Sequence, residues 1–267
     1  MLLYLRELSD NKKSFFIWIG SFIIINIIIF SFYPSVADEA TSFKEILQSY
    51  PEVMLKIFGA HQLDLSNILH SFGVYSYLFI TILGSIYALT LGSEIIAKEQ
   101  DDKTIEFLLA KPISRKSIVT SKTMTVFTYI LVFNIILFIF DYALLEIFKR
   151  DQYSIKLFVL LSLGSLMLHL TYAAIGIFIS SVITKVRTVM PMSLGIVFGM
   201  FAISKASSIS DRLSGLKYIT PFSYVDATDI ITNGRIDYIF IIIMIAIIAF
   251  FISAAYVYYS RKDIYYS

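Results

Sequence analysis

Six long runs of apolar residues dominate this sequence. They cover about residues 14–33, 72–93, 123–142, 157–184, 188–204 and 238–259. A helix needs about 20 apolar residues to cross the roughly 30 Å of membrane hydrocarbon, and each run is close to that length. The sequence therefore predicts an all-α integral membrane protein with six transmembrane helices. We place Asp141 at the outer end of the third span, and Pro191 within the first turn of the fifth.

Composition supports this class. Of the residues, 57% are hydrophobic and 16% are charged, whereas soluble domains carry about 25% charged residues. The absence of cysteine excludes disulfides, thiolate metal sites and a cysteine nucleophile. The net charge of +2 is too small to indicate a nucleic-acid partner. We expect one transmembrane domain over residues 1–267, with membrane lipid as its surroundings.

Lysine and arginine are concentrated in alternate polar segments, and this bias sets the orientation. Thirteen of the 22 basic residues lie in four segments, namely residues 1–13, 93–122, 184–188 and 260–267. Because cytoplasmic loops carry the excess of positive charge, we expect both termini in the cytoplasm. A cleaved signal peptide ending near Ser35–Ala37 is the alternative, but its apolar region would be longer than usual.

Three polar segments outside the spans show helical patterns. In residues 1–13, leucines recur every third position, which suits a helix lying along the inner interface; the alternative is simply the start of the first span. In the first outer loop, Ser42–Glu45 fits a capping box and Pro51 can start a second short helix. Residues 205–236 are too polar to span and too apolar for a solvated loop, so we expect a re-entrant or interfacial helix there.

The segment between the second and third spans reads as helix, break, helix. Glu94 with Lys98, and Glu99 with Lys103, are i,i+4 pairs in the favourable order. Pro112 ends the first helix.

Ser114 can cap a second helix that continues into the third span. Ile105, Leu108 and Leu109 form an apolar stripe, which needs a covering of lipid, of this chain or of another protein.

Motifs for enzyme chemistry are missing. The sequence contains no H-E-x-x-H, no G-x-S-x-G and no P-loop, so this chain has no site of its own for ATP phosphates. Of the ionisable residues we place only His169 deep within a span, as a hydrogen-bonding partner of a neighbouring helix or as a proton relay. Asn26 and Asn134 suit interhelical hydrogen bonds. Gly195 and Gly199 form a G-x-x-x-G, which favours helix packing or a dimer contact.

The stretch from Ser93 to Lys122 resembles the signature of ABC-2 type permeases, the membrane subunits of bacterial ABC exporters. The positions that carry the resemblance are Glu94, Glu99, Thr104, Glu106, Leu108, Leu109, Pro112, Ser114, Arg115 and Lys122. Together with Ile105 of the apolar stripe they form the expected ATPase-coupling segment. Lys103 departs from the glycine usual in that family. Residues 50–59 and 220–226 also resemble family features, so the resemblance covers nearly the whole chain.

The resemblance implies a type V, ABC-2 exporter-like fold, with a coupling helix between spans two and three that docks on a separate ABC ATPase. Two ATPase copies would pair with two permease copies, identical or related, and ATP and Mg²⁺ would bind the ATPase, leaving no cofactor in this chain. Pro221 and Phe222 would belong to an outer gate or re-entrant segment.

The expected function is export of an apolar or amphipathic peptide, drug or lipid-like molecule across the cytoplasmic membrane of a bacterium. The alternatives are an ion-coupled secondary transporter and a membrane immunity or scaffold protein that does not pump.

Overall fold

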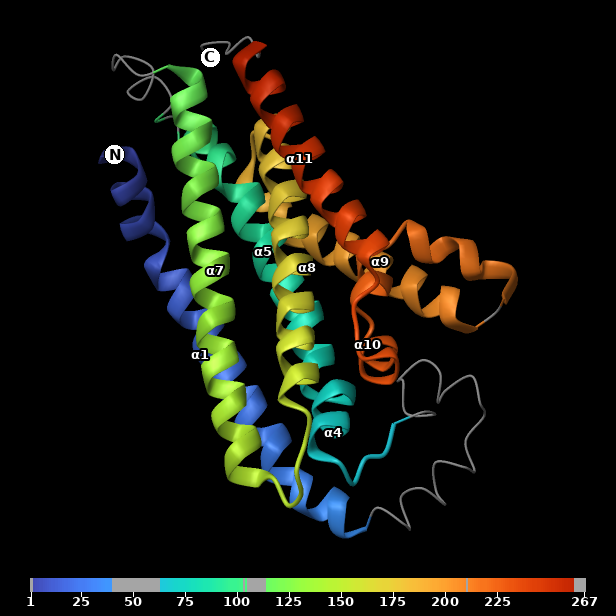
Figure 1. Cartoon of the computed structure of the whole chain (residues 1–267). Helices are drawn as coiled ribbons and strands as arrows, with labels where there is room; N and C mark the ends of the chain where they lie inside the picture. Colours follow the sequence, from blue (N-terminus) through green and yellow to red (C-terminus); the bar gives the residue numbers. More distant parts are fainter. Residues whose placement is uncertain (1, 40–62, 103, 105–113, 210, 262–267) are drawn as a thin grey trace.

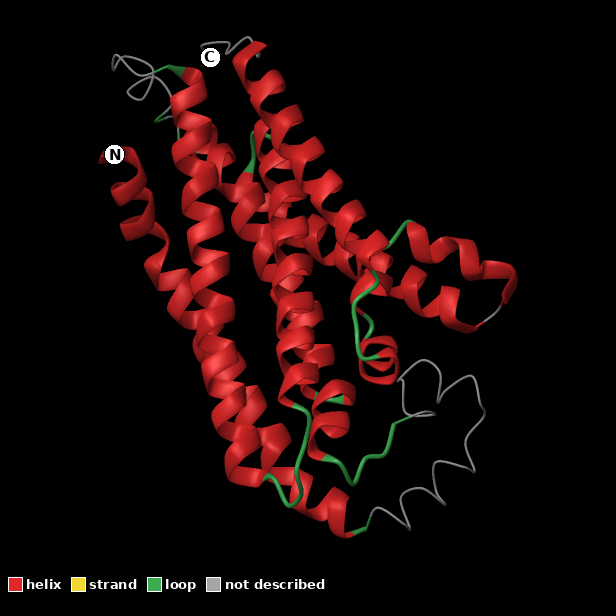
Figure 2. Cartoon of the chain, viewed as in Figure 1, coloured by secondary structure: helices red, strands yellow, loops and turns green. Residues whose placement is uncertain are grey.

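The computed structural model describes residues 2–39, 63–102, 104, 114–209 and 211–261 of the chain. In that part the chain is helical, with short loops between the helices (Figure 2). The elements are α1 (Leu2–Asp38), α4 (Ile68–Val74), α5 (Ser76–Asp101), α7 (Arg115–Phe148), α8 (Ile155–Val182), η1 (Val186–Thr188), α9 (Val189–Ile209), η2 (Asp211–Tyr218), η3 (Pro221–Val225), α10 (Ala227–Asn233) and α11 (Tyr238–Arg261).

Six helical stretches in the described part are long and apolar enough to cross a membrane, as the sequence predicted. They contain α1, α4 with α5, α7, α8, α9 and α11, and they form one elongated bundle (Figure 1). We call the end at which α1 begins, α5 ends and α7 begins the N-terminal end, and the opposite end the far end. The last turn of α11 also lies at the N-terminal end, where Arg115 Nη1 is 3.5 Å from the Ser260 carbonyl oxygen.

Residues 2–13 belong to the same continuous helix as the first span, because α1 has 37 residues, which agrees with the alternative that this segment is the start of that span. Its first turns pack along α7: the Tyr4 hydroxyl lies 3.0 Å from Thr128 Oγ1, and the Tyr129 hydroxyl donates to the Leu8 carbonyl. These contacts hold the start of the chain against the bundle. At its other end α1 continues past Pro34, so part of the expected outer loop is helical.

Two glycines bring α5 and α8 into backbone contact. A Cβ atom added to Gly92 would lie 2.5 Å from the Ala173 carbonyl oxygen, and one added to Gly176 would lie 2.5 Å from the Leu89 carbonyl oxygen. No side chain fits at either position, and small residues are what allow membrane helices to approach this closely. The helix pair α5–α8 is therefore the most tightly packed unit of the bundle.

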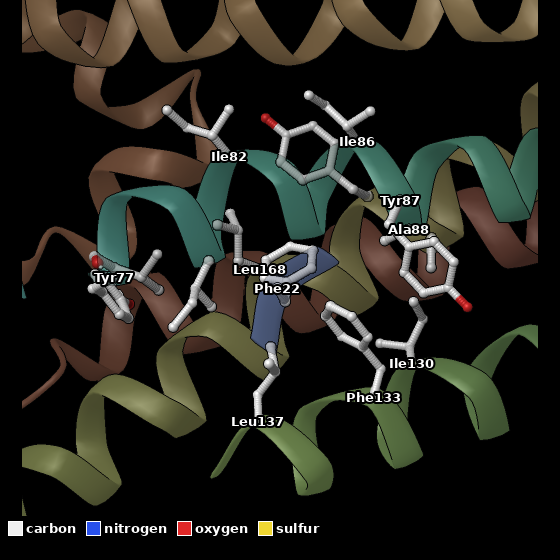
Figure 3. Close-up of a cluster of buried hydrophobic side chains, with 14 of the residues drawn as sticks. Phe22, Tyr77, Ile82, Ile86, Tyr87, Ala88, Ile130, Phe133, Leu137 and Leu168 are labelled. Atoms are coloured by element: carbon white, nitrogen blue, oxygen red, sulfur yellow. Dashed lines mark hydrogen bonds between the residues drawn. The ribbon is translucent and has the colours of Figure 1, made fainter. Parts of the chain in front are cut away.

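Aromatic side chains from α1, α5 and α7 meet beside this pair and fill the core (Figure 3). The Phe133 ring is fully buried, with its centroid 5.0 Å from that of Phe22 on α1 and 5.1 Å from that of Tyr87 on α5. Offset and edge-to-face geometries of this kind stabilise aromatic pairs beyond their buried area. The core thus joins α1 and α7 to the α5–α8 pair.

The polar stretch after α9 returns into the bundle. The Phe222 ring in η3 lies 5.5 Å from that of Tyr172, near the middle of α8, and the Tyr77 hydroxyl donates to the Val225 carbonyl. The end of α9 and η2 form an arm that stands out to one side (Figure 1). In this structure η3 lies among the helices, which is the geometry that a re-entrant segment needs.

Several expected features lie outside the described residues. These are the capping box at Ser42–Glu45, the helix start at Pro51, Lys103 and most of the proposed coupling helix, including Ile105, Glu106, Leu108, Leu109 and Pro112.

Candidate functional site

A fully buried lysine marks the N-terminal end of the bundle. Lys122 on α7 has an exposed fraction of 0%, and its Nζ lies 2.7 Å from Glu7 Oε1, 2.6 Å from the Ile95 carbonyl oxygen and 3.0 Å from Glu99 Oε1. An ammonium group has three N–H donors, so every one of them has an acceptor. Lys122 therefore binds α1 and α5 at the same time.

Glu7 on α1 is the partner that connects the site across the bundle. Its side chain is 1% exposed, and while Oε1 binds Lys122, Oε2 lies 2.6 Å from the Nζ of Lys98 on α5. One carboxylate thus pairs with two ammonium groups from two other helices. A buried charge is tolerated only when it is paired in this way.

Glu99 completes the site and connects it to the segment that follows α5. Its Oε1 accepts from Lys122, and its Oε2 accepts a hydrogen bond from the Thr104 hydroxyl. We call Glu7, Lys98, Glu99 and Lys122 the ionic cluster. With two carboxylates and two ammonium groups it is neutral, which lowers the cost of keeping it out of water.

Further contacts position the backbone on both sides of residues 103–113. Asp101 Oδ2 accepts from the backbone N–H of Val186 in η1 at 3.0 Å. Ser180 Oγ on α8 lies 2.8 Å from the backbone nitrogen of Ile96. Ser114 caps α7, as the sequence predicted, with its Oγ accepting from the Ser117 N–H.

The structure brings together only some of the signature residues. Glu99 and Lys122 meet in the ionic cluster and Thr104 bonds to Glu99, whereas Arg115 lies beside α11. The expected Glu94–Lys98 pair does not occur among the ion pairs of the described residues. Lys98 pairs with Glu7 instead. Glu94 is half-buried on α5 outside the cluster.

Sequence reasoning missed Glu7 altogether. Its position among leucines in an N-terminal segment resembles an ordinary amphipathic pattern, and nothing local indicates a partner 115 residues away. The available signal was Lys122, a cation directly before the third span, since a lysine that becomes buried requires a carboxylate.

Near the middle of the bundle His169 ties three helices together. It is fully buried on α8, with Nδ1 3.1 Å from Asn134 Oδ1 on α7 and Nε2 3.1 Å from the Ile80 carbonyl oxygen on α5. Both ring nitrogens face polar atoms of neighbouring helices. This agrees with the prediction that His169 forms hydrogen bonds to a neighbouring helix. Asn26, which we had also expected to bond between helices, donates only to Phe22 of its own helix among the described residues.

Asp141 is another buried ionisable group on a membrane-length helix, in addition to His169 and the ionic cluster. Helix α7 continues beyond Asp141 to Phe148, and the side chain of Asp141 is 3% exposed. Its expected place at the outer end of the third span stays a prediction. Its Oδ1 has no hydrogen-bond partner among the described residues. Carboxyl groups placed in this way within membrane helices usually mark a function.

In the segment that follows α9, Asp226 caps α10 and pairs with Lys205 of α9. Asp226 Oδ1 accepts from the Thr228 N–H at 2.9 Å, and Oδ2 lies 3.1 Å from Lys205 Nζ. Burial by itself raises the pKa of this carboxyl group, but the Lys205 ammonium and the backbone N–H donors outweigh that effect and hold the pKa of Asp226 below its usual value.

Replacing Asp226 by alanine is expected to lower the free energy of unfolding by about 1 kcal/mol at neutral pH, the usual value of a helix cap. Because the pKa is lower in the folded protein, this stabilisation is present above the unfolded-state pKa of about 4 and is lost as the pH falls through the folded-state value. Thermal unfolding of both proteins across pH checks this. The gap between their midpoints should be constant near neutral pH and close in acid; a gap that persists unchanged in acid would contradict the assignment.

Gly195 and Gly199 face outward on α9. A Cβ atom added to either would meet no other atom within 4 Å in the described part of the chain. Within the described part of the chain they do not mediate tight helix packing, and their role as a dimer contact stays a prediction.

The bundle, its membrane-length helices and its buried charges define a multi-pass α-helical membrane protein. Over residues 1–264 the chain matches the model of the family described as ABC-2 family transporter protein, so it belongs to the ABC-2 transporter family, whose members are membrane subunits of transporters. A search of curated proteins found no match. Among the described residues no group of three or more His, Asp or Glu side chains could hold a metal ion.

Proposed function

We propose that this chain is the permease subunit of an ATP-driven exporter in the cytoplasmic membrane of a bacterium. In this proposal the N-terminal end of the bundle faces the cytoplasm, in keeping with the basic residues concentrated there. A separate ABC ATPase docks on residues 103–113. The observation that carries the proposal is the ionic cluster, which binds both flanks of that segment to α1.

The cluster offers a route for mechanical work. Glu99 precedes residues 103–113 and bonds to Thr104 near the start of that segment, and Lys122 follows the segment. A displacement of the segment by an ATPase would move the end of α5 and the start of α7 together, since Lys122 bonds to both Glu99 and the Ile95 carbonyl. Through Glu7, the same movement would reach α1.

The rest of the proposal follows the family. Two copies of this chain, or this chain and a related one, would form the pathway, and two ATPases would bind ATP and Mg²⁺. The sequence has no P-loop, so the nucleotide chemistry belongs to the partner. The cargo is an apolar or amphipathic molecule, which suits spans built mainly from isoleucine, phenylalanine and tyrosine.

The docking segment can be tested by replacing Leu108 and Leu109 together with aspartate. We expect at least a tenfold loss of the ATP hydrolysis that co-purifies with the affinity-tagged chain, because a charged pair in an apolar contact costs well over 1.4 kcal/mol. ATP-driven uptake of a hydrophobic fluorescent dye into inverted vesicles should fall with it. Leu213→Asp is the control: Leu213 is exposed in η2 and should leave both readouts unchanged. Survival of both activities in the double variant would disprove the docking role.

Asp141 favours a second candidate function, ion-coupled transport. A buried carboxyl group without a hydrogen-bond partner at Oδ1 is the kind of group that carries protons in secondary transporters. The same vesicles separate the two functions. Uptake that needs ATP and survives collapse of the proton gradient supports the exporter, whereas uptake that needs only the gradient and is lost in Asp141→Asn supports the second candidate.

A further inference from the structure

A cavity of about 350 Å³ lies between α1 and the α4–α5 region, towards the far end of the bundle. Ile29, Phe32 and Val36 line it from α1, Ile68 and Phe72 from α4, and Phe79 from α5. It is separate from the ionic cluster, which joins these helices at the opposite end. Its volume falls in the range of small-molecule sites and is far too small for another helix.

The lining offers hydrocarbon and little else. No charged residue contributes to it. Two of the polar groups in its wall have partners within the protein: the Tyr33 hydroxyl donates to the Ser66 carbonyl at 2.7 Å, and the Ser71 hydroxyl donates to the Leu65 carbonyl at 2.7 Å. The Ser76 hydroxyl is buried in the wall without a hydrogen-bond partner among the described residues, and it is a small polar site in a lining that is otherwise apolar. An apolar cavity of this kind does not hold water stably, so its natural content is a hydrocarbon group.

The mouth of the cavity opens on the lipid-facing surface. Phe32 and Phe79 at its edge are 64% and 41% exposed. On α1, the exposed side chains of Ile24 and Ile28 extend this apolar surface from Phe32 along the helix. In a membrane protein with six spans such an apolar surface faces lipid tails, because the hydrocarbon region around the spans consists of lipid tails and excludes water. The molecules that reach the mouth are therefore lipids.

We propose that this cavity binds one acyl chain of a membrane lipid, inserted sideways between α1 and the α4–α5 region. The inserted chain fills the space that protein side chains leave open at this end of the bundle. The two helices are then joined by protein charges at the N-terminal end and by a lipid chain towards the far end. This inference is independent of the proposed exporter function.

The test uses the full chain reconstituted into phosphatidylcholine vesicles that contain a small fraction of phosphatidylcholine with a photoactivatable diazirine on one acyl chain. After illumination, mass spectrometry maps the labelled residues. We expect labelling of Val36 and Phe72 inside the cavity to exceed that of the exposed Ile245 on α11. Ile29→Trp, which fills the cavity, should reduce the labelling inside it about tenfold, the effect of losing about two buried methylene groups.

Ile28→Trp is the matched control. Ile28 is the neighbouring residue on α1, is 52% exposed and does not line the cavity, so labelling inside should stay unchanged. If Ile29→Trp does not fold, Val36→Trp fills the same space and labelling is then read at Phe72. The proposal is overturned if the cavity and Ile245 are labelled equally and neither Ile29→Trp nor Val36→Trp changes the labelling. That result would show that only ordinary boundary lipid contacts the protein. Labelling of Ile28 with none inside would also overturn it, by showing that the chain itself fills or closes the cavity.

Discussion

Replacing Lys122 by methionine is expected to lower the free energy of unfolding by about 3–5 kcal/mol, the largest loss of any single charge in the described part of the protein. The physical reason is the pair of carboxylates left behind. Glu7 is 1% exposed and Glu99 is 12% exposed, so both would lose their buried cation without gaining water. Unfolding of the detergent-solubilised protein, followed by heat or denaturant, measures the change.

Two further variants make the result specific. Lys12→Met removes a lysine that is exposed on α1 at the same end of the bundle and should change the stability by less than about 0.5 kcal/mol. Adding Glu7→Gln to Lys122→Met leaves Lys98 and Glu99 as one positive and one negative charge, so we expect at least half of the loss to be recovered. Equal effects of Lys12→Met and Lys122→Met would show that the ionic cluster does not form.

Replacing Gly176 by leucine is expected to destabilise the protein by about 3 kcal/mol or more, or to prevent folding. A Cβ atom there would lie 2.5 Å from the Leu89 carbonyl oxygen and 2.9 Å from the Ser93 backbone nitrogen. Backbone atoms within a helix cannot move aside as a flexible side chain can, so α5 and α8 must separate and lose their packing. The yield of folded protein and its unfolding midpoint in detergent measure the effect.

Gly20→Leu is the control for glycine replacement itself. Gly20 is also in a membrane-length helix, but an added Cβ atom would meet nothing within 4 Å. Leucine is a better helix former than glycine by about 0.8 kcal/mol, so this variant should be neutral or slightly more stable. If Gly176→Leu behaves like Gly20→Leu, the close contact between α5 and α8 is wrong.

The six spans were predictable because the physics behind them is local. The length of an apolar run and the thickness of hydrocarbon decide whether a helix can cross, and neither depends on what the helix contacts. The Ser114 cap was predictable for a similar reason, since its acceptor oxygen and the Ser117 N–H lie within one turn.

Helix ends were less predictable, because hydropathy locates the membrane rather than the helix. Helix α7 has 34 residues and is far longer than the hydrocarbon requires. Counting apolar residues ended the third span at about residue 142, although the helix continues to Phe148 and the Asp141 carboxyl group is buried against its neighbours. The same limit hid the continuity of α1, whose polar first turns belong to the bundle through Tyr4 and Tyr129.

Within the candidate site, some residues were predictable from the sequence and one became apparent only in the structure. Glu99 before residues 103–113, Thr104 at their start and Lys122 after them were visible in the sequence and belong to the positions that carried the family resemblance. Glu7 was not visible, because its role depends on α1 lying beside both α5 and α7, and no short-range pattern encodes that neighbourhood.

The sequence by itself determined that this protein crosses the membrane six times, where its basic residues gather and which residues flank the proposed docking segment. Tertiary structure alone decided which charges meet, which glycines touch and which apolar surfaces leave a cavity. The physical reason is the distance along the chain over which each interaction acts. Hydrophobic length, helix caps and charge bias act within a few turns of one helix, whereas the pairing of Glu7 with Lys122, the contact of Gly92 with Gly176 and the opening beside Ile29 all require distant helices to pack.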